Sequence, residues 1–177
     1  MRNVCRILLL ALAAAFFCGC AFSADTPREP PQMNVRTQAG ETGAVRFGWE
    51  WDVQRRWSKN GWGVTVDSAD PLKWEYEPIP VFIGEDLTFV FPEGGEPDGV
   101  SVDFYPLDEA GEADWDSVFH MIAEQFGDNG AWGVRLRNDS GLQAQKGIFI
   151  VEAKWNEPRY RGEATYAFAV TPRESGE

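Results

Sequence analysis

Apolar and polar residues alternate strictly over residues 44–53, which predicts a half-buried strand. The apolar positions are Val45, Phe47, Trp49, Trp51 and Val53, and the positions between them are Arg46, Gly48, Glu50 and Asp52. A period of two places the apolar set on one face of a strand. Burying each such side chain stabilises a fold by roughly 1.5–3 kcal/mol, so this face needs a second layer to cover it. We therefore expect the row to form the inner wall of a layered β structure.

Six further alternating runs follow, separated by turn residues. They are predicted as strands at 61–67, 87–91, 100–104, 132–136, 147–155 and 163–171, with shorter candidates at 33–37 and 81–83. Asn60-Gly61 favours a hairpin that returns the chain beside 44–53. Residues 147–155 are apolar on both faces at first, which is typical of a central strand. Short strands with regular turn signals predict a sandwich or barrel.

One segment has a different period. Within residues 114–126, apolar side chains recur at the spacing of one helical stripe: Trp115, Val118, Phe119, Ile122 and Phe126. Asp114 is a suitable N-cap and Gly127 a suitable C-terminal residue. The pattern predicts one short helix in an inter-strand connection, closing an end of the sandwich.

The first twenty residues predict an export signal. Arg2 and Arg6 precede an apolar run over 7–17, which is shorter than the roughly 20 residues that a membrane-spanning helix needs. The end of the run, Phe17-Cys18-Gly19-Cys20, resembles a bacterial lipoprotein signal, although Phe17 and Cys18 depart from its usual Leu and its usual Ala or Ser. That resemblance implies lipidation of Cys20 and a membrane-anchored protein on the extracytoplasmic side. Secretory cleavage after Ala21, giving a secreted or periplasmic protein, is the alternative.

The remainder divides into three parts. The segment 21–32 has three prolines and no apolar period, so we expect a tether; 33–172 is long enough for a single β-sandwich domain, and 173–177 is a tail. All three cysteines lie within 1–20, so the domain contains no disulfide. Loss of Arg2 and Arg6 with the signal leaves 14 of the 16 basic side chains against 28 acidic ones, a net charge of −14. Such a charge opposes nucleic acid as a partner.

Candidate binding residues are aromatic and basic side chains in two predicted loops. They are Arg55, Arg56, Trp57 and Lys59 in the first loop and Trp74 and Tyr76 in the second. Exposed aromatic rings among cations stack on sugars or peptides, while buried indoles would only anchor the loops.

Catalytic and metal-binding patterns are weak. The sequence has one His, and it has no Gly-x-Ser-x-Gly turn and no phosphate-binding loop. Asp116, His120 and Glu124 would share one face of the predicted helix and are weak candidate metal ligands, because a solvated polar face explains the same spacing. We therefore expect that the protein is not an enzyme and binds no metal and no cofactor.

A family resemblance lies in the closing strands. The runs 147–155 and 162–170, with the stretch 78–91, resemble immunoglobulin-like domains of small extracytoplasmic bacterial lipoproteins of unassigned function. The resemblance implies an all-β, immunoglobulin-like antiparallel sandwich of about seven or eight strands. It carries no catalytic residue. We expect a monomeric envelope binding module, membrane-anchored through lipid, with a glycan or protein ligand. Alternatives are an inhibitor-like or structural envelope protein and, less favoured, a metal-dependent hydrolase.

The lipidation hypothesis predicts the mature N-terminus. Mass spectrometry of the membrane-bound protein should find Cys20 as the first residue, with a mass increase that corresponds to attached acyl chains. A mature chain that begins at Phe22 would show ordinary secretory cleavage instead.

Overall fold

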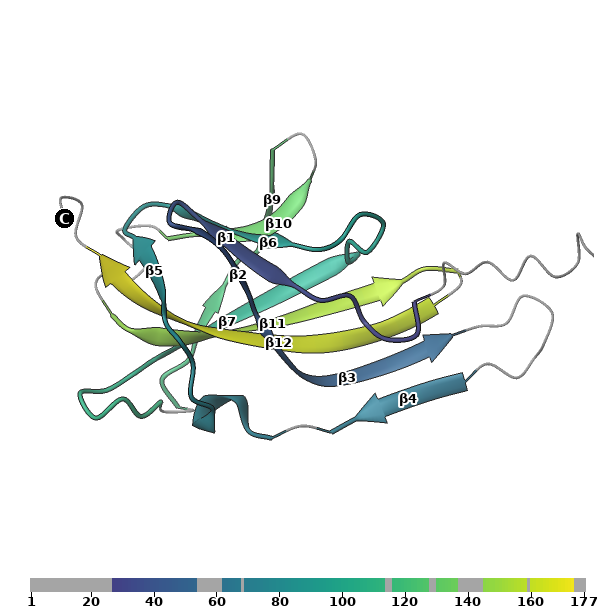
Figure 1. Cartoon of the computed structure of the whole chain (residues 1–177), viewed down its shortest axis with the longest axis horizontal. Coiled ribbons are helices and arrows are strands. Elements are labelled where there is room, and N and C mark those ends of the chain that lie inside the picture. Colours follow the sequence, from purple (N-terminus) through teal and green to yellow (C-terminus); the bar gives the residue numbers. More distant parts are fainter. Residues whose placement is uncertain are drawn as a thin grey trace, which may run out of the picture.

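Two β-sheets pack face to face and form the domain. The computed structural model describes residues 27–53, 62–67, 69–113, 116–127, 130–136, 145–158 and 160–173. Within these ranges the strands are β1 Asn34–Thr37, β2 Gly40–Gly43, β3 Val45–Val53, β4 Trp62–Val66, β5 Ile79–Phe82, β6 Asp86–Val90, β7 Gly99–Pro106, β8 Phe119–Met121, β9 Glu124–Phe126, β10 Ala131–Arg135, β11 Gly147–Asn156 and β12 Tyr160–Arg173. One 3₁₀ helix, η1 (Pro71–Lys73), lies between β4 and β5. The expected all-β sandwich is confirmed (Figure 1).

The sheets differ in width. The smaller has the order β2-β1-β6-β10-β9, and the larger has the order β4-β3-β12-β11-β7-β8, with β5 also pairing with β12. Pairing is antiparallel except between β5 and β12, which run parallel. The predicted final hairpin is confirmed: β11 and β12 pair from Gly147 opposite Val170 to Asn156 opposite Arg161. β11 lies between β12 and β7, which explains why its first residues are apolar on both faces.

The inner core is rich in aromatic side chains. The largest fully buried ones are Trp51, Trp155, Tyr166, Phe89, Phe104 and Phe149. The rings of Trp51 and Trp155 meet edge to face with centroids 5.4 Å apart, and those of Phe149 and Phe168 stack at 5.1 Å. Each such pair adds about 0.5–1.5 kcal/mol beyond its burial. The indole N–H of Trp155 donates to the Gly95 carbonyl at 3.0 Å, so the core has no unpaired indole there.

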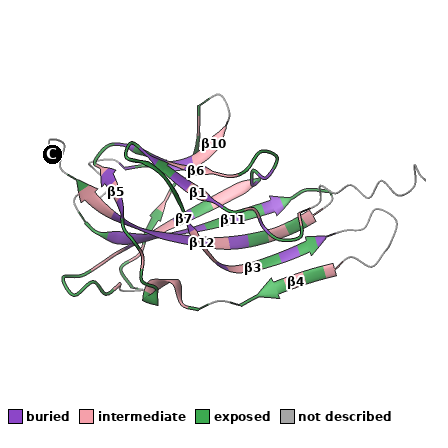
Figure 2. Ribbon diagram, viewed as in Figure 1, coloured by how far each residue is buried: buried purple, intermediate pink, exposed green. Residues whose placement is uncertain are grey.

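A second apolar cluster lies on the outer face of the larger sheet. Its buried members are Phe47, Tyr105, Ile148, Ile150, Ala167 and Ala169. Leu72 and Tyr76 from the β4–β5 connection pack against them, as do Leu107, Ala113 and Val118 from the β7–β8 connection. Two connections thus act as a partial third layer over one part of this sheet. Figure 2 shows the buried centre of β12 between more exposed ends.

The aromatic row of β3 does not keep to one face, contrary to the sequence prediction. Arg46 lies opposite Tyr166 and Trp49 opposite Ala164, so three steps along β3 match two along β12. This β-bulge reverses the alternation at Gly48. Trp49, Trp51 and Val53 consequently belong to the inner core, whereas Phe47 belongs to the outer cluster.

The predicted helix over 114–126 is wrong. Its described part contains two short strands, β8 and β9, which pair with β7 in the larger sheet and with β10 in the smaller one. Ile122, in the middle of the supposed apolar stripe, is 82% exposed. The 3₁₀ helix η1 is the one helical element in the described ranges, and Asp70 caps it by accepting from the Leu72 N–H at 3.0 Å.

Glu85 is a buried charged residue that the sequence pattern does not reveal. It is 3% exposed, and its carboxylate accepts from the backbone N–H groups of Phe82 at 2.6 Å and Gln38 at 2.8 Å. The carboxylate thereby joins the β5–β6 turn to the β1–β2 turn.

Replacing Glu85 tests this joint. Glu85→Ala should lower the free energy of unfolding by about 2–4 kcal/mol, because two backbone donors lose a charged acceptor at a buried site. The measurement is urea denaturation. Glu93→Ala, at an exposed turn position, is the matched control and should change stability by less than about 0.5 kcal/mol. Equal effects of the two changes would contradict a structural role for Glu85.

Candidate functional site

Residues 27–32, here called the N-terminal strap, lie against the inner face of β3. The Trp51 indole N–H donates to the Pro27 carbonyl at 3.0 Å, and the Tyr166 hydroxyl donates to the Pro31 carbonyl. Burial raises the pKa of Tyr166, with Arg46 nearby acting in the opposite direction, so the hydroxyl stays protonated and donates. The part of the predicted tether from Pro27 onward is therefore packed on the sandwich.

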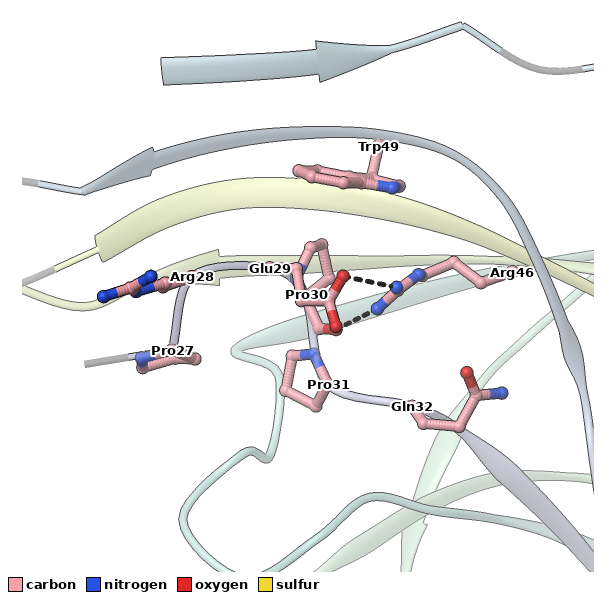
Figure 3. Close-up of a pocket in the computed structure, with 8 residues that line it drawn as sticks. All are labelled: Pro27, Arg28, Glu29, Pro30, Pro31, Gln32, Arg46 and Trp49. Atoms are coloured by element: carbon pink, nitrogen blue, oxygen red, sulfur yellow. Dashed lines mark hydrogen bonds and ion pairs between the residues drawn. The ribbon is translucent and has the colours of Figure 1, made fainter. Parts of the chain in front are cut away.

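Arg46 is the central contact of the strap. Its guanidinium pairs with Glu29 at 2.9 Å and donates to the Pro30 carbonyl, and it lies 5.7 Å from the centroid of the Trp49 ring. The bulge places Arg46 and Trp49 on the same inner face, which makes this arrangement feasible. Figure 3 shows Arg46 reaching Glu29 below the Trp49 ring.

An open cavity of about 620 Å³ follows the strap. Its lining consists of all six strap residues together with Arg46 and Trp49. Of the two arginines in its wall, Arg28 belongs to the strap itself, and Arg46 pairs with Glu29 and donates to the Pro30 carbonyl, so the Arg46 contacts hold the strap in place. We interpret this cavity as structural.

A separate aromatic group, here called the Trp74 patch, consists of Phe47, Trp74 and Tyr76. Trp74 is 51% exposed, and its ring meets Phe47 edge to face with centroids 5.8 Å apart. Tyr76 lies 6.3 Å from Phe47, and its hydroxyl donates to the Pro71 carbonyl at 2.7 Å. Burial, and secondarily Asp70, raise the pKa of Tyr76, which keeps this donor protonated. Tyr76 thus anchors the connection, whereas Trp74 presents a supported indole to solvent.

The other predicted binding residues cannot be placed. Arg55, Arg56, Trp57 and Lys59 lie outside the described residues, between the end of β3 and the start of β4, and Cys20 precedes the first described residue. Of the described candidates, Trp74 and Tyr76 come together with Phe47, a residue that the sequence did not mark as part of a site. The signal that could have found it is Gly48, since glycine inside a strand pattern often marks a bulge.

The candidate metal ligands do not converge. His120 lies on β8 and Glu124 on β9, in different sheets, and Asp116 precedes both. His120 Nδ1 is instead 2.7 Å from Asp103 Oδ1 on the neighbouring strand β7. In the described part of the chain, no three His, Cys, Asp or Glu side chains are grouped so that they could hold a metal ion.

Comparison of the chain with protein-family models, curated proteins and solved structures finds no match. Across the described ranges, no helix is long and apolar enough to cross a membrane.

Removing the guanidinium of Arg46 should loosen the strap. Arg46→Met keeps an apolar stem but leaves Glu29 and the Pro30 carbonyl without their donor, so unfolding should become easier by about 1–3 kcal/mol. Within residues 27–32, backbone amide hydrogen exchange and cleavage by a protease should both become faster.

Arg36→Met is the control for Arg46→Met, because Arg36 pairs with Glu41 at the surface, where the two side chains are 55% and 36% exposed. Surface pairs of this kind contribute at most about 1 kcal/mol. Unchanged protection of the strap in Arg46→Met would contradict the central role of Arg46.

Proposed function

We propose that the chain is a lipid-anchored, non-catalytic binding module of the bacterial cell envelope, with the Trp74 patch as its contact surface. The observation that carries the proposal is the position of Trp74, a half-exposed indole supported edge to face by Phe47. Large exposed indoles are uncommon because their burial is favourable. An indole that the fold supports but does not cover is typical of a binding hot spot.

The patch favours a ligand with a flat or apolar face. The Trp74 ring is held by one ring contact, and its connection is fixed by the Tyr76–Pro71 hydrogen bond and the Asp70 cap. A side chain held in this way loses little conformational freedom when it binds. A sugar ring or a peptide side chain would stack on such an indole, which agrees with the expected glycan or protein ligand.

The strap supports the anchored arrangement. A lipid at Cys20 would be separated from Pro27 by seven residue steps, which span at most about 25 Å. The first described residues and η1 lie toward opposite ends of the long axis (Figure 1). In this proposal the Pro27 end of the strap therefore faces the membrane, and Trp74, at the end of η1, lies toward the other end. The resemblance to extracytoplasmic lipoproteins favours the same location.

An inhibitor-like or structural envelope protein is the alternative function. Such a protein would use the same exposed indole to bind a single partner protein. A glycan-binding module would instead bind purified cell-wall polymer that contains no protein. The two functions are therefore separable by testing retention on purified cell-wall glycan and on envelope protein separately.

Replacement of Trp74 tests the proposal. Trp74→Ala should weaken retention on envelope material about tenfold or more, because hot-spot indoles contribute at least about 1.4–2 kcal/mol to binding. The thermal midpoint should fall by only a few degrees, because half of the residue is already exposed and its ring contact with Phe47 contributes about 0.5–1.5 kcal/mol. Ile122→Ala, at an even more exposed apolar position remote in sequence, is the control and should retain binding. A large loss of stability in Trp74→Ala, or unchanged retention, would refute the patch as the contact surface.

A further inference from the structure

β4 forms a free edge of the larger sheet. It is the terminal strand in the order β4-β3-β12-β11-β7-β8, and all five of its residues pair in continuous register with β3. Its outer side pairs with no other described strand, and Figure 1 shows β4 at the rim of the molecule. An edge strand presents unpaired backbone donors and acceptors that can pair with an added strand.

The other edges carry features that oppose strand addition. β2 is four residues long and carries the ion-paired Glu41, and β5 contains Pro80. β8 and β9 are each three residues long and carry His120 and Glu124. β4 reads Trp-Gly-Val-Thr-Val, with no charge, no proline and no register shift. Among the described edges, β4 therefore lacks the usual protection against pairing.

The two faces of β4 differ in chemistry. Trp62, Val64 and Val66 lie opposite Val53, Trp51 and Trp49, so they extend the inner apolar row to the rim. Val66 is 37% exposed there. On the outer face, the small residues Gly63 and Thr65 lie opposite Asp52 and Glu50. A Cβ at position 63 would overlap Asp52 Oδ1, so this carboxylate leans over β4 toward the edge.

We propose that the β4 edge binds an extended basic peptide as an added strand, with apolar residues facing inward and Lys or Arg facing outward. Asp52 and Glu50 have no ion pair with another described residue. Neighbouring strands lie about 4.8 Å apart, so a Lys or Arg side chain on the added strand can extend across Gly63 or Thr65 to these two carboxylates. The net charge of −14 without residues 1–19 attracts such a peptide. A second copy fits less well, because antiparallel pairing of two β4 edges would bring like carboxylates onto one sheet surface. This surface is the rim of the sheet, so the inference does not depend on the Trp74 patch.

Three synthetic peptides test the proposal with the unmodified mature protein. The first alternates lysine and valine over seven residues with blocked ends, the second has glutamate in place of lysine, and the third is the lysine peptide with N-methyl groups on alternate backbone nitrogens. Isothermal titration should give a dissociation constant at least about tenfold lower for the first peptide than for the other two, because only it offers both charge and backbone pairing.

Matched variants locate the site. Thr65→Lys places a positive charge on the β4 edge and should weaken binding of the lysine peptide about tenfold, while Thr42→Lys makes the same change on the exposed edge strand β2 and should leave the affinity within about twofold. The double change Glu50→Gln with Asp52→Asn should weaken binding about three- to tenfold and reduce its salt dependence.

Several results would overturn the proposal. Equal affinity for the N-methylated peptide would show that charge alone is sufficient, and equal effects of Thr65→Lys and Thr42→Lys would place binding elsewhere. Concentration-dependent dimerisation in analytical ultracentrifugation that Thr65→Lys abolishes would show that a second copy occupies the edge. The peptide comparison uses the unchanged chain, so it decides the question even if Thr65→Lys fails to fold.

Discussion

The bulge in β3 is the constraint on which the surface of this protein depends. One extra residue between Arg46 and Trp49, relative to β12, reverses the faces of all residues on one side of Gly48. Arg46 and Trp49 therefore face inward, where Arg46 holds the strap. Phe47 faces outward, where it supports Trp74. In a regular strand Phe47 and Trp49 would share one face, and one of these two arrangements would be lost.

The strap shows how proline carbonyls are satisfied without a strand. Proline has no N–H group, so a segment with Pro27, Pro30 and Pro31 cannot complete a ladder, but its carbonyls still need donors when they are buried. Here all three donors are side chains of the sandwich: Trp51, Arg46 and Tyr166. Tyr166 is 135 positions away from its acceptor. No local sequence signal links residues so far apart, which explains why composition alone predicted a free tether over 21–32.

Period-two alternation predicted most of the long strands well, although the start of β11 and the middle of β12 are buried on both faces. β3, β4, β6, β7, β10, β11 and β12 were all expected, and the pairing of β11 with β12 followed from the short connection between them. The pattern could not reveal which face each half of β3 takes, because parity along a strand assumes a regular register. The segment 114–126 failed for a different reason. Three-residue strands are too short to show a period. β8 and β9 form because they pair with β7 and β10, and neither pairing can be inferred from the residues of 114–126 alone.

The candidate sites were less predictable than the fold, because exposure is decided by tertiary packing. Trp74 and Tyr76 looked equivalent as loop aromatics, yet Tyr76 packs into the outer cluster and Trp74 stays half exposed. Both outcomes follow from the limited reach of the two connections that cover the outer face. They bury the part of the sheet around Phe47, Ile148 and Ile150, and they leave the part around Glu50 and Asp52 open. Within the described part of the chain, open surfaces therefore include the border of that cover, where Trp74 lies, and the outer side of β4, which pairs with no other described strand.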